Sequence, residues 1–485
     1  MKLTDAHYRA LFEPRGIVVA GAAGHPGKFG FVALHNLRAC GYQGSVEATN
    51  LTGDDVLGRP THRSVLDVPG EVDLVFSCVP GPAVPDVIRQ AAERGALAVY
   101  CAGAGFGEVD DAGRRLEDEL VAVAEECGVL LAGPNGQGVI STPVSMCAQI
   151  VAPMPPTGVI GVASQSGGFS SSWGNLARQS GVGISRAVSA GNSAQVGVAD
   201  YLEWFTTDPA TRVGLAYVED VDDTLVSRLE AVGAAMPLVV LRGGRTAEVR
   251  EAVAAHTGSR AGSPEVDAEL AEAGVTVVRS VREAWEAAAS FATQPAPPGP
   301  RTIVFGTAGG WGVVTADAVV DSELELVDLP DDLRAAVDAR VPPRWSRRNP
   351  IDLAGGETRD TIPELLDVIA NHPEVDAVVY LGLGIQANQA ALARAGGFHP
   401  DFGLDRIVDF HERQDARYAQ AAAEASARTG KPILTATELA TADPDNAGPA
   451  AVRASGRLCY PSGDDAVRAL EHLWRDALRR VDRSP

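Results

Sequence analysis

One histidine, His256, lies in a loop whose residue types suit chemistry on an anion. The loop, residues 255–263, reads Ala-His-Thr-Gly-Ser-Arg-Ala-Gly-Ser. Glycines let the backbone approach a ligand closely, and hydroxyl and amide groups supply hydrogen-bond donors. An imidazole among such donors can meet an anion such as a phosphoryl group. A histidine in a polar loop is more often a solvated side chain, so this hypothesis depends on the rest of the chain.

Three copies of one pattern provide the elements that could position this histidine. Each copy has a short β-rich run, a glycine-rich turn and then a helical pattern, and the copies begin at residues 16, 159 and 302. The turns of the three copies are residues 21–30, 164–170 and 306–312. Where a helix starts after such a turn, its free N–H groups and its dipole favour an anion. The pattern therefore predicts three phosphate-binding βα units.

Two proline-rich segments, residues 152–158 and 293–300, separate the three copies. Further apolar runs alternate with helical stretches in every block, for example at 74–79 and 213–218. Strands that alternate with helices are typical of parallel sheets covered on both faces. We therefore expect an α/β chain of three consecutive domains, over residues 1–150, 158–292 and 301–480.

Composition excludes several classes of protein. The 485 residues are too many for one core, and a net charge of −22 argues against nucleic acid and anionic membrane surfaces as partners. No segment has the roughly 18 uninterrupted apolar residues of a membrane helix. The six cysteines form no Cys-x-x-Cys pair, which indicates neither a disulfide framework nor a zinc site. The N-terminus lacks a signal-peptide core, so we expect a cytoplasmic protein.

The first glycine loop fits neither of two common nucleotide motifs. Its spacing is Gly21-x-x-Gly24-x-x-Gly27, whereas dinucleotide-binding loops have G-x-G-x-x-G. The next β-rich run ends at Asn50, where a nicotinamide-dinucleotide site would have an acidic residue. A P-loop would require glycine at Ala22 and a hydroxyl residue at Phe29. A different phosphate-bearing nucleotide and a plain structural turn both stay open at this point.

Further motifs follow the first loop in a fixed order. They are Ala-Gly-Ala-Gly-Phe-Gly-Glu at 102–108, Gly-Pro-Asn at 133–135, Ser-Gln-Ser-Gly-Gly at 164–168, Ser-Ala-Gly-Asn at 189–192, Gly-Gly-Arg at 243–245, His-Thr-Gly-Ser at 256–259, Ala-Gly-Gly at 308–310 and Asn-Pro-Ile-Asp at 349–352. With these motifs the chain resembles the α subunit of the NDP-forming acyl-CoA synthetases (acetate–CoA ligase, ADP-forming), in the succinyl-CoA synthetase superfamily. The resemblance extends from about residue 12 to about residue 474.

The resemblance implies a fold and a reaction. The first domain would be Rossmann-like and bind CoA, and the other two would be flavodoxin-like, the earlier one carrying His256. In the family, acyl-CoA and phosphate give an acyl phosphate and CoA. The acyl phosphate then phosphorylates a histidine, which passes the phosphoryl group to ADP. By resemblance His256 is that histidine, and a neutral imidazole nitrogen suits reversible phosphoryl capture.

The resemblance also assigns a carboxylate to this histidine. Glu219, at the end of an apolar run, matches the family glutamate that holds one imidazole nitrogen and leaves the other free to attack. Asp220 beside it is the alternative partner.

Other site residues follow from the same resemblance. Those that bind phosphate would be Ser166, Gly167 and Gly168, with a second cradle at Gly309 and Gly310. Those that bind CoA would be Gly21, Gly24, Gly27, Lys28, Asn50, Val79, Pro80 and Asn135. We expect no metal site in the chain. ATP or ADP with Mg²⁺ would bind a separate ATP-grasp β subunit, since no such domain is recognisable here, and the family implies an oligomer.

The chain departs from the family pattern at several points. Asn50-Leu51-Thr52 stands where Asn-Pro-Lys is common, so a contact to a CoA phosphate is expected to be missing. Gly136 replaces a cysteine and is expected to leave more room near the reacting centre, and Trp311 replaces a proline. The region 386–428, which includes His399 and His411, is longer than in relatives.

Two other functions stay open. A CoA- or acyl-CoA-binding protein that regulates without turnover would need neither His256 nor Glu219, and the missing nucleotide domain keeps it in view. An NAD-dependent dehydrogenase is disfavoured by the loop spacing.

Overall fold

The computed structural model describes residues 1–219, 221–244, 249, 265–356 and 358–482. It divides into two compact units. Unit 1 is Met1–Arg178 with Gly183–Ala284, and unit 2 is Gln179–Val182 with Trp285–Pro485. Within the described ranges, none of the helices combines the length and apolar composition that crossing a membrane requires.

The first sheet of unit 1 is parallel throughout, in the order β2-β1-β3-β4-β5. Its strands are β1 (Gly16–Ala20), β2 (Ser45–Thr49), β3 (Leu74–Ser77), β4 (Ala98–Cys101) and β5 (Leu130–Ala132). The associated helices are α1 (Asp5–Phe12), α2 (Phe29–Ala39), η1 (Val65–Asp67), η2 (Gly81–Ala83), α3 (Val84–Glu93) and α4 (Asp111–Cys127). Strand order reverses between β1 and β3, and such a switch point opens a ligand crevice beyond the carboxyl ends of the strands.

The second sheet of unit 1 has the order β12-β11-β10-β8-β9-β6-β7. Its strands are β6 (Gly138–Ser141), β7 (Met146–Gln149), β8 (Thr157–Ser164), β9 (Ile184–Ser189), β10 (Val213–Val218), β11 (Leu238–Arg242) and β12 (Thr276–Val278). Its helices are η3 (Thr142–Val144), α5 (Gly167–Ser180), α6 (Val198–Phe205), α7 (Asp223–Ala235) and α9 (Val266–Glu272). The next helix, α10 (Val281–Thr293), begins in unit 1 and belongs mostly to unit 2. β6 is antiparallel to both β9 and β7. Residues 138–149, inside the range expected for the first domain, therefore join the second sheet.

Unit 2 contains one parallel sheet in the order β14-β13-β16-β17-β18, with β15 also paired to β13. Its strands are β13 (Arg301–Gly306), β14 (Glu325–Leu326), β15 (Ile351–Asp352), β16 (Ala377–Leu381), β17 (Ile433–Ala436) and β18 (Cys459–Tyr460). Its helices are α11 (Gly309–Val320), α12 (Asp331–Asp338), α13 (Thr361–Asn371), α14 (Ile385–Ala395), α15 (Leu404–Thr429), α16 (Leu439–Ala442), α17 (Ala447–Ala454) and α18 (Gly463–Asp482).

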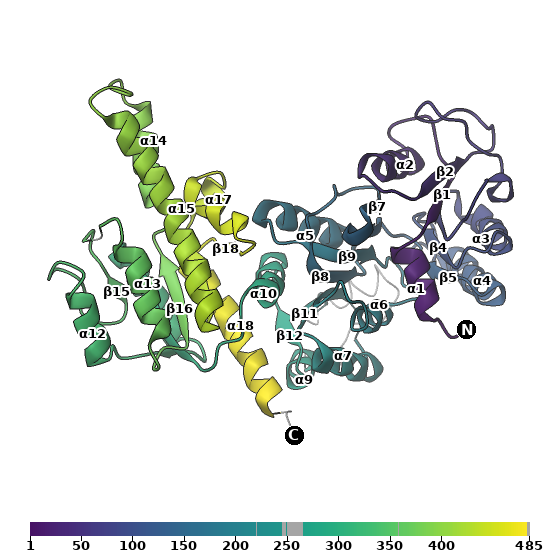
Figure 1. Cartoon of the computed structure of the whole chain (residues 1–485). Coiled ribbons are helices and arrows are strands. Elements are labelled where there is room, and N and C mark those ends of the chain that lie inside the picture. Colours follow the sequence, from purple (N-terminus) through teal and green to yellow (C-terminus); the bar gives the residue numbers. More distant parts are fainter. Residues whose placement is uncertain (220, 245–248, 250–264, 357, 483–485) are drawn as a thin grey trace. The chain divides into compact units, whose positions relative to one another are not determined.

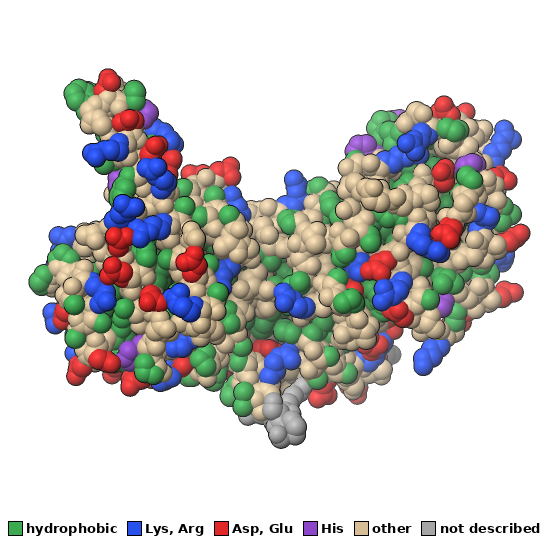
Figure 2. Space-filling view, in the orientation of Figure 1, with side chains coloured by type: hydrophobic (Ala, Val, Ile, Leu, Met, Phe, Trp, Pro, Cys, Tyr) green, Lys and Arg blue, Asp and Glu red, His purple; other side chains and the backbone are tan. Residues whose placement is uncertain are grey.

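The apolar runs of the sequence became fully buried strands. Every residue of β1, β10 and β16 is buried, as expected for central parallel strands with helices on both faces. The expected expansion at residues 386–428 forms α14 and α15, a helix pair that projects beyond the sheet of unit 2 (Figure 1). Hydrophobic, acidic and basic side chains are mixed along this pair (Figure 2).

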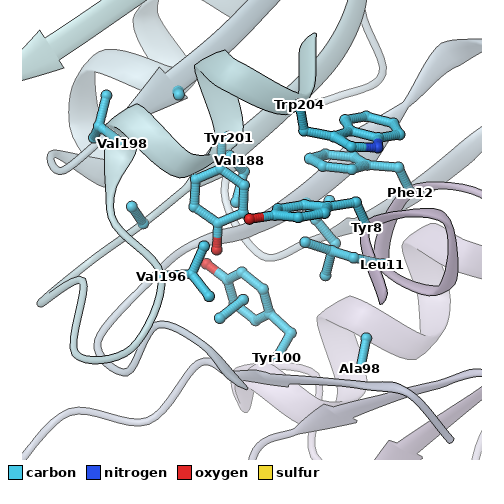
Figure 3. Close-up of a cluster of buried hydrophobic side chains, with 14 of the residues drawn as sticks. Tyr8, Leu11, Phe12, Ala98, Tyr100, Val188, Val196, Val198, Tyr201 and Trp204 are labelled. Atoms are coloured by element: carbon cyan, nitrogen blue, oxygen red, sulfur yellow. The ribbon is translucent and has the colours of Figure 1, made fainter. Parts of the chain in front are cut away.

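An aromatic cluster joins α1 to α6 inside unit 1 (Figure 3). The rings of Phe12 and Trp204 stack with centroids 5.1 Å apart, and Tyr8 stacks on the same indole at 5.7 Å. Arg186, on β9, is 1% exposed and pairs with Asp208 at 3.0 Å and with Glu13. Ring stacking and a buried ion pair thus hold α1 against α6 and β9, which belong to the second sheet of unit 1 and its helices.

Replacing Arg186 by methionine should lower the free energy of unfolding by about 3–5 kcal/mol, because Asp208 would become an uncompensated buried charge. Urea unfolding at neutral pH measures this. Arg89→Met, which removes an exposed arginine paired with Asp86 on α3, should change stability by less than about 0.5 kcal/mol.

The difference in the free energy of unfolding between the wild type and Arg186→Met should become smaller at acidic pH. Burial raises the pKa of Asp208, but the hydrogen bonds and charge of Arg186 outweigh burial and hold that pKa below its ordinary value. The stabilisation is therefore complete above the ordinary carboxyl pKa of about 4 and is lost as pH falls through the lowered native value. A stability difference that stays constant on acidification would contradict this account.

Candidate active site

A cavity of about 500 Å³ lies in unit 1 where loops of its two sheets meet. The loops after β4 and β5 of the first sheet supply Glu108 and Asn135 to its lining. The ends of β8 and β10 of the second sheet supply Ser166 and Glu219. Four segments that the sequence suggested separately therefore contribute to one cavity.

The N-terminus of α5 opens onto this cavity through Ser166 and Gly167. The first N–H groups of a helix have no acceptor within the helix and, with the helix dipole, favour an anion. A methyl group on Gly167 would overlap the side chain of Gln137, which would have to move to make room for it. Gln137 in turn accepts a 2.6 Å hydrogen bond from the Ser171 hydroxyl, one turn along α5. Gly168 is exposed and is not part of the lining.

Glu219 follows the last residue of β10 and is only 8% exposed. Its N–H donates to Gln165 Oε1 at 2.7 Å, and its Oε1 accepts from the Tyr217 hydroxyl at 3.0 Å. Burial and the Glu219 charge raise the pKa of Tyr217, which keeps this phenol a hydrogen-bond donor. The carboxylate therefore has a fixed orientation beside the turn that begins α5.

Asn135 belongs to a chain of amide and carboxylate groups on the opposite side of the cavity. Its Nδ2 donates to Asn192 Oδ1 at 3.1 Å. Asn192 Nδ2 donates to Glu108 Oε2 at 2.6 Å and to Glu117 Oε2 at 2.7 Å. Burial raises the pKa of Glu108, but hydrogen bonds from Asn192 and from backbone N–H groups, including that of Gly105, outweigh it and hold the pKa below its ordinary value. The ionised carboxylate of Glu108 thus holds Asn192, and Asn192 in turn orients Asn135.

The expectation of extra room at Gly136 is wrong. A Cβ there would overlap the Tyr100 hydroxyl, so a ring from β4 already fills the space that a side chain would take. Tyr100 donates to the Ser189 carbonyl at 2.6 Å and accepts from the Gly138 N–H at 2.7 Å. Gly136 therefore allows Tyr100 to join the two sheets.

The first glycine loop lies at the switch point between β1 and β3. A Cβ on Gly21 would meet Val79 Cγ1 at 3.0 Å, which places Val79 and Pro80, just after β3, beside this loop. A Cβ on Gly30 would overlap the Gly21 carbonyl, so the loop and α2 approach as closely as glycine permits.

Residues 24–29, the middle of this loop and the start of α2, are exposed. A Cβ on Gly24 would have no neighbour within 4 Å, and Gly27, like Lys28, is exposed. The loop is thus closely packed on its inner side and open on its outer side, which fits a backbone cradle for a diphosphate.

Asn50 does not present its side chain outward. Its Oδ1 accepts hydrogen bonds from the N–H groups of Gly53 at 2.5 Å and Asp54 at 3.2 Å, and from the Thr52 hydroxyl at 3.2 Å. The side chain holds its own turn, as asparagine often does after a strand.

Two other expected residues lie in unit 2, and two fall outside the described residues. Gly309 and Gly310 begin α11 in unit 2, where a Cβ on Gly309 would meet Asp352 Oδ2 at 2.5 Å and one on Gly310 would meet nothing within 4 Å. His256 and the alternative carboxylate Asp220 lie outside the described residues.

Sequence reasoning missed several residues of the cavity. Gln165, Asn192 and Glu108 stand inside motifs that were identified, but no role was assigned to their side chains. Glu117 and Gln137 stand in no motif and give no local signal. Only their contacts reveal them.

Three family models match successive parts of the chain. They are a CoA binding domain over residues 15–142, a succinyl-CoA ligase like flavodoxin domain over 157–291 and a ligase-CoA domain over 302–387.

Similar proteins and structures extend this match. The α subunit of acetate–CoA ligase (ADP-forming) I from Pyrococcus furiosus is 33% identical over 77% of this chain and 82% of its own length. The 4-hydroxybutyrate–CoA ligase (ADP-forming) of Nitrosopumilus maritimus is 30% identical over 76% of this chain but only 54% of its own length, so this chain spans about half of it. Acetyl-coenzyme A synthetase 1 of Ca. Korarchaeum cryptofilum, solved with phosphate and ADP, has a TM-score of 0.82 at 27% identity and covers 98% of both chains.

Alanine at two neighbouring glycines should have unequal effects. Gly167→Ala should destabilise unit 1 by about 1–3 kcal/mol, because its methyl group must displace Gln137. Gly168→Ala should leave stability unchanged or slightly raised, since the nearest atom, Ser166 Oγ, would be 3.5 Å from the new carbon. Urea unfolding of the two variants checks this, and equal losses would refute the packing of Gln137 on the turn.

Proposed function

The chain belongs to the family of α subunits of ADP-forming acyl-CoA synthetases, and on this premise we propose its reaction and its site. The protein interconverts acyl-CoA, ADP and phosphate with a carboxylic acid, CoA and ATP. It does so through an acyl phosphate and a phosphohistidine at His256.

The proposed reaction has three steps. A phosphate oxygen forms a bond to the thioester carbonyl carbon, the C–S bond breaks, and the phosphate proton goes to the CoA sulfur. An imidazole nitrogen of His256 then bonds to phosphorus, and the P–O bond breaks to release the carboxylate. The phosphoryl group finally passes from nitrogen to the terminal oxygen of ADP. Most of the catalysis of such transfers is positioning and charge stabilisation.

The cavity of unit 1 is the observation that carries this proposal. It gathers a helix N-terminus at Ser166 and Gly167, a buried carboxylate at Glu219 and an amide at Asn135. A helix N-terminus can hold phosphoryl oxygens, and an amide N–H can donate to an acyl oxygen. A protein that only binds CoA needs no buried carboxylate beside a phosphate cradle.

Glu219 acts in the proposal as the partner of one His256 nitrogen. Its carboxylate accepts from the Tyr217 hydroxyl and its backbone N–H donates to Gln165, so it can fix the imidazole tautomer and leave the other nitrogen free for phosphorus. Ser166, Gly167 and Gly168 offer the phosphoryl group their hydroxyl and first-turn N–H groups.

The glycine loop of the first sheet serves as the CoA diphosphate cradle. Its open side, at Gly24, Gly27 and Lys28, is exposed and carries the ammonium group of Lys28 for phosphate oxygens, while the N–H groups of Gly27 and Lys28 donate to His25 and hold the shape of the loop. The match of residues 15–142 to a CoA binding domain supports this assignment. Val79 and Pro80 border the crevice at the switch point between β1 and β3. The Asn50 side chain contributes to the CoA site only by holding the turn at the end of β2.

The remaining parts are assigned to unit 2 and to a partner. Gly309 and Gly310 form a second phosphoryl cradle at the start of α11, and ADP or ATP with Mg²⁺ binds a separate ATP-grasp subunit. The word subunit in the name of the Pyrococcus relative supports a partner. The three functional domains correspond to residues 1–150, 158–292 and 301–480, although β6 and β7 of the first range pair within the second sheet.

Labelled inorganic phosphate should be incorporated into the purified chain in the presence of a productive acyl-CoA. The label should be acid-labile, as expected for phosphorus on nitrogen, and should be absent in His256→Ala. A panel of acyl-CoAs in the same assay names the acyl class. Binding of CoA with no label from any acyl-CoA would instead support a non-catalytic CoA-binding protein.

Glu219→Gln should slow this phosphorylation on the order of a hundredfold to ten-thousandfold, because the histidine would lose its orienting charge. Rapid-quench measurement of the labelling rate tests the effect. The matched change Glu230→Gln, at an exposed position of α7, should leave the rate within about twofold of the wild type. Equal rates for Glu219→Gln and the wild type would exclude Glu219 as the partner of His256.

A further inference from the structure

The carboxyl end of β2 carries no cation on its own turn, although a phosphate of CoA is expected near it. In dinucleotide-binding sheets, the ribose next to the adenine lies at the end of this strand. In CoA that ribose carries a 3′-phosphate. The turn itself, Asn50-Leu51-Thr52, is uncharged, and Asn50 is engaged in holding the turn.

A second segment brings an arginine to this position. His62 pairs with the end of β2: its N–H donates to the Ala48 carbonyl at 2.9 Å, and its carbonyl accepts from the Asn50 N–H at 2.9 Å. This pairing fixes the next residue, Arg63, alongside the turn. A Cβ on Gly53 would lie 3.6 Å from Arg63 Nε, so the guanidinium stem lies directly over the turn.

The same strand end also adjoins the glycine loop. The N–H groups of Gly21 and Ala22 donate to the Thr49 carbonyl at 3.0 and 2.9 Å. The end of β2 thus contacts the glycine loop, which is the proposed diphosphate cradle. The turn at residues 50–53, beside Arg63, follows the same strand end. A nucleotide whose diphosphate lies on the loop would bring its ribose to this turn.

Arg63 is suited to phosphate by exposure and charge. It is exposed, and among the described residues the structure gives it neither a hydrogen bond nor an ion pair. The neighbouring Arg38 is otherwise engaged, since it donates to the Val56 carbonyl, and burial together with the charge of Arg59 lowers its pKa. In a chain with a net charge of −22, an unengaged arginine at this site is notable, and guanidinium binds phosphate oxygens in a bidentate fork.

We propose that Arg63 binds the ribose 3′-phosphate of CoA and distinguishes CoA from dephospho-CoA. This inference rests on the proposed use of CoA. Arg63 supplies the phosphate contact that the uncharged turn at residues 50–52 lacks, and it does so from a segment about ten residues further along the chain.

Isothermal titration of the full chain with CoA and with dephospho-CoA tests the proposal without relying on turnover. The wild type should bind CoA about tenfold more tightly than dephospho-CoA. Arg63→Gln should abolish that preference while leaving the affinity for dephospho-CoA unchanged. Arg63→Lys should retain part of it, because lysine keeps the charge but not the fork.

Arg89→Gln provides the charge-matched control, since it removes one exposed positive charge from the same unit on α3. It should keep the full preference of the wild type. A preference that survives in Arg63→Gln, or an equal loss in Arg89→Gln, would overturn the role of Arg63. A wild type that binds both ligands equally would do the same, whereas no binding of either ligand would overturn the proposed use of CoA itself.

Discussion

The candidate site depends on one close approach between backbone segments of unit 1. The loop after β5 lies directly on the loop after β9, because the N–H groups of Asn192 and Ala194 donate to the carbonyls of Pro134 and Gly133 at 2.9 and 3.2 Å. A side chain at Gly191 would overlap the Pro134 carbonyl. Without this contact the two sheets would present their loops separately, and no cavity would form between them.

Polar groups fix the side chains once the loops are in contact. Asn135, Asn192, Glu108 and Glu117 form a connected set in which each amide has a defined partner. Buried polar networks whose members are all bonded rigidify their surroundings, and a missing member leaves the others unsatisfied. Hydrogen bonds among residues of its own lining therefore help to set the geometry of the cavity.

The acidity of the chain makes the sources of positive potential informative. The described lining of the cavity includes the carboxylates of Glu108, Glu117 and Glu219 and the guanidinium of Arg114. In the proposed function, the N–H groups at the start of α5 add a further attraction for a phosphoryl group. Such dipoles are fixed by the backbone and need no counter-ion. At the exposed first glycine loop, where solvent screens the field, the proposed CoA contacts are side-chain cations, Lys28 and Arg63.

The local βα units could be predicted from the amino-acid sequence. Apolar runs followed by glycine-rich turns predicted β1, β8 and β13 with the helices that follow them, because strand and helix periodicity and turn chemistry are local properties. The α/β class was correct for the same reason. Glu219 could be located at the end of a strand, and the family motifs gave the order of the remaining parts.

The contacts between distant segments could not be predicted in this way and are known from the folded structure. β6 and β7, expected in the first domain, pair within the second sheet. Tyr100 occupies the space beside Gly136. Asn50 turned its side chain inward, and Glu117 joined Asn192 across 75 residues of chain. Strand partners and side-chain directions of this kind depend on packing between distant segments, and no local pattern of residues encodes that packing.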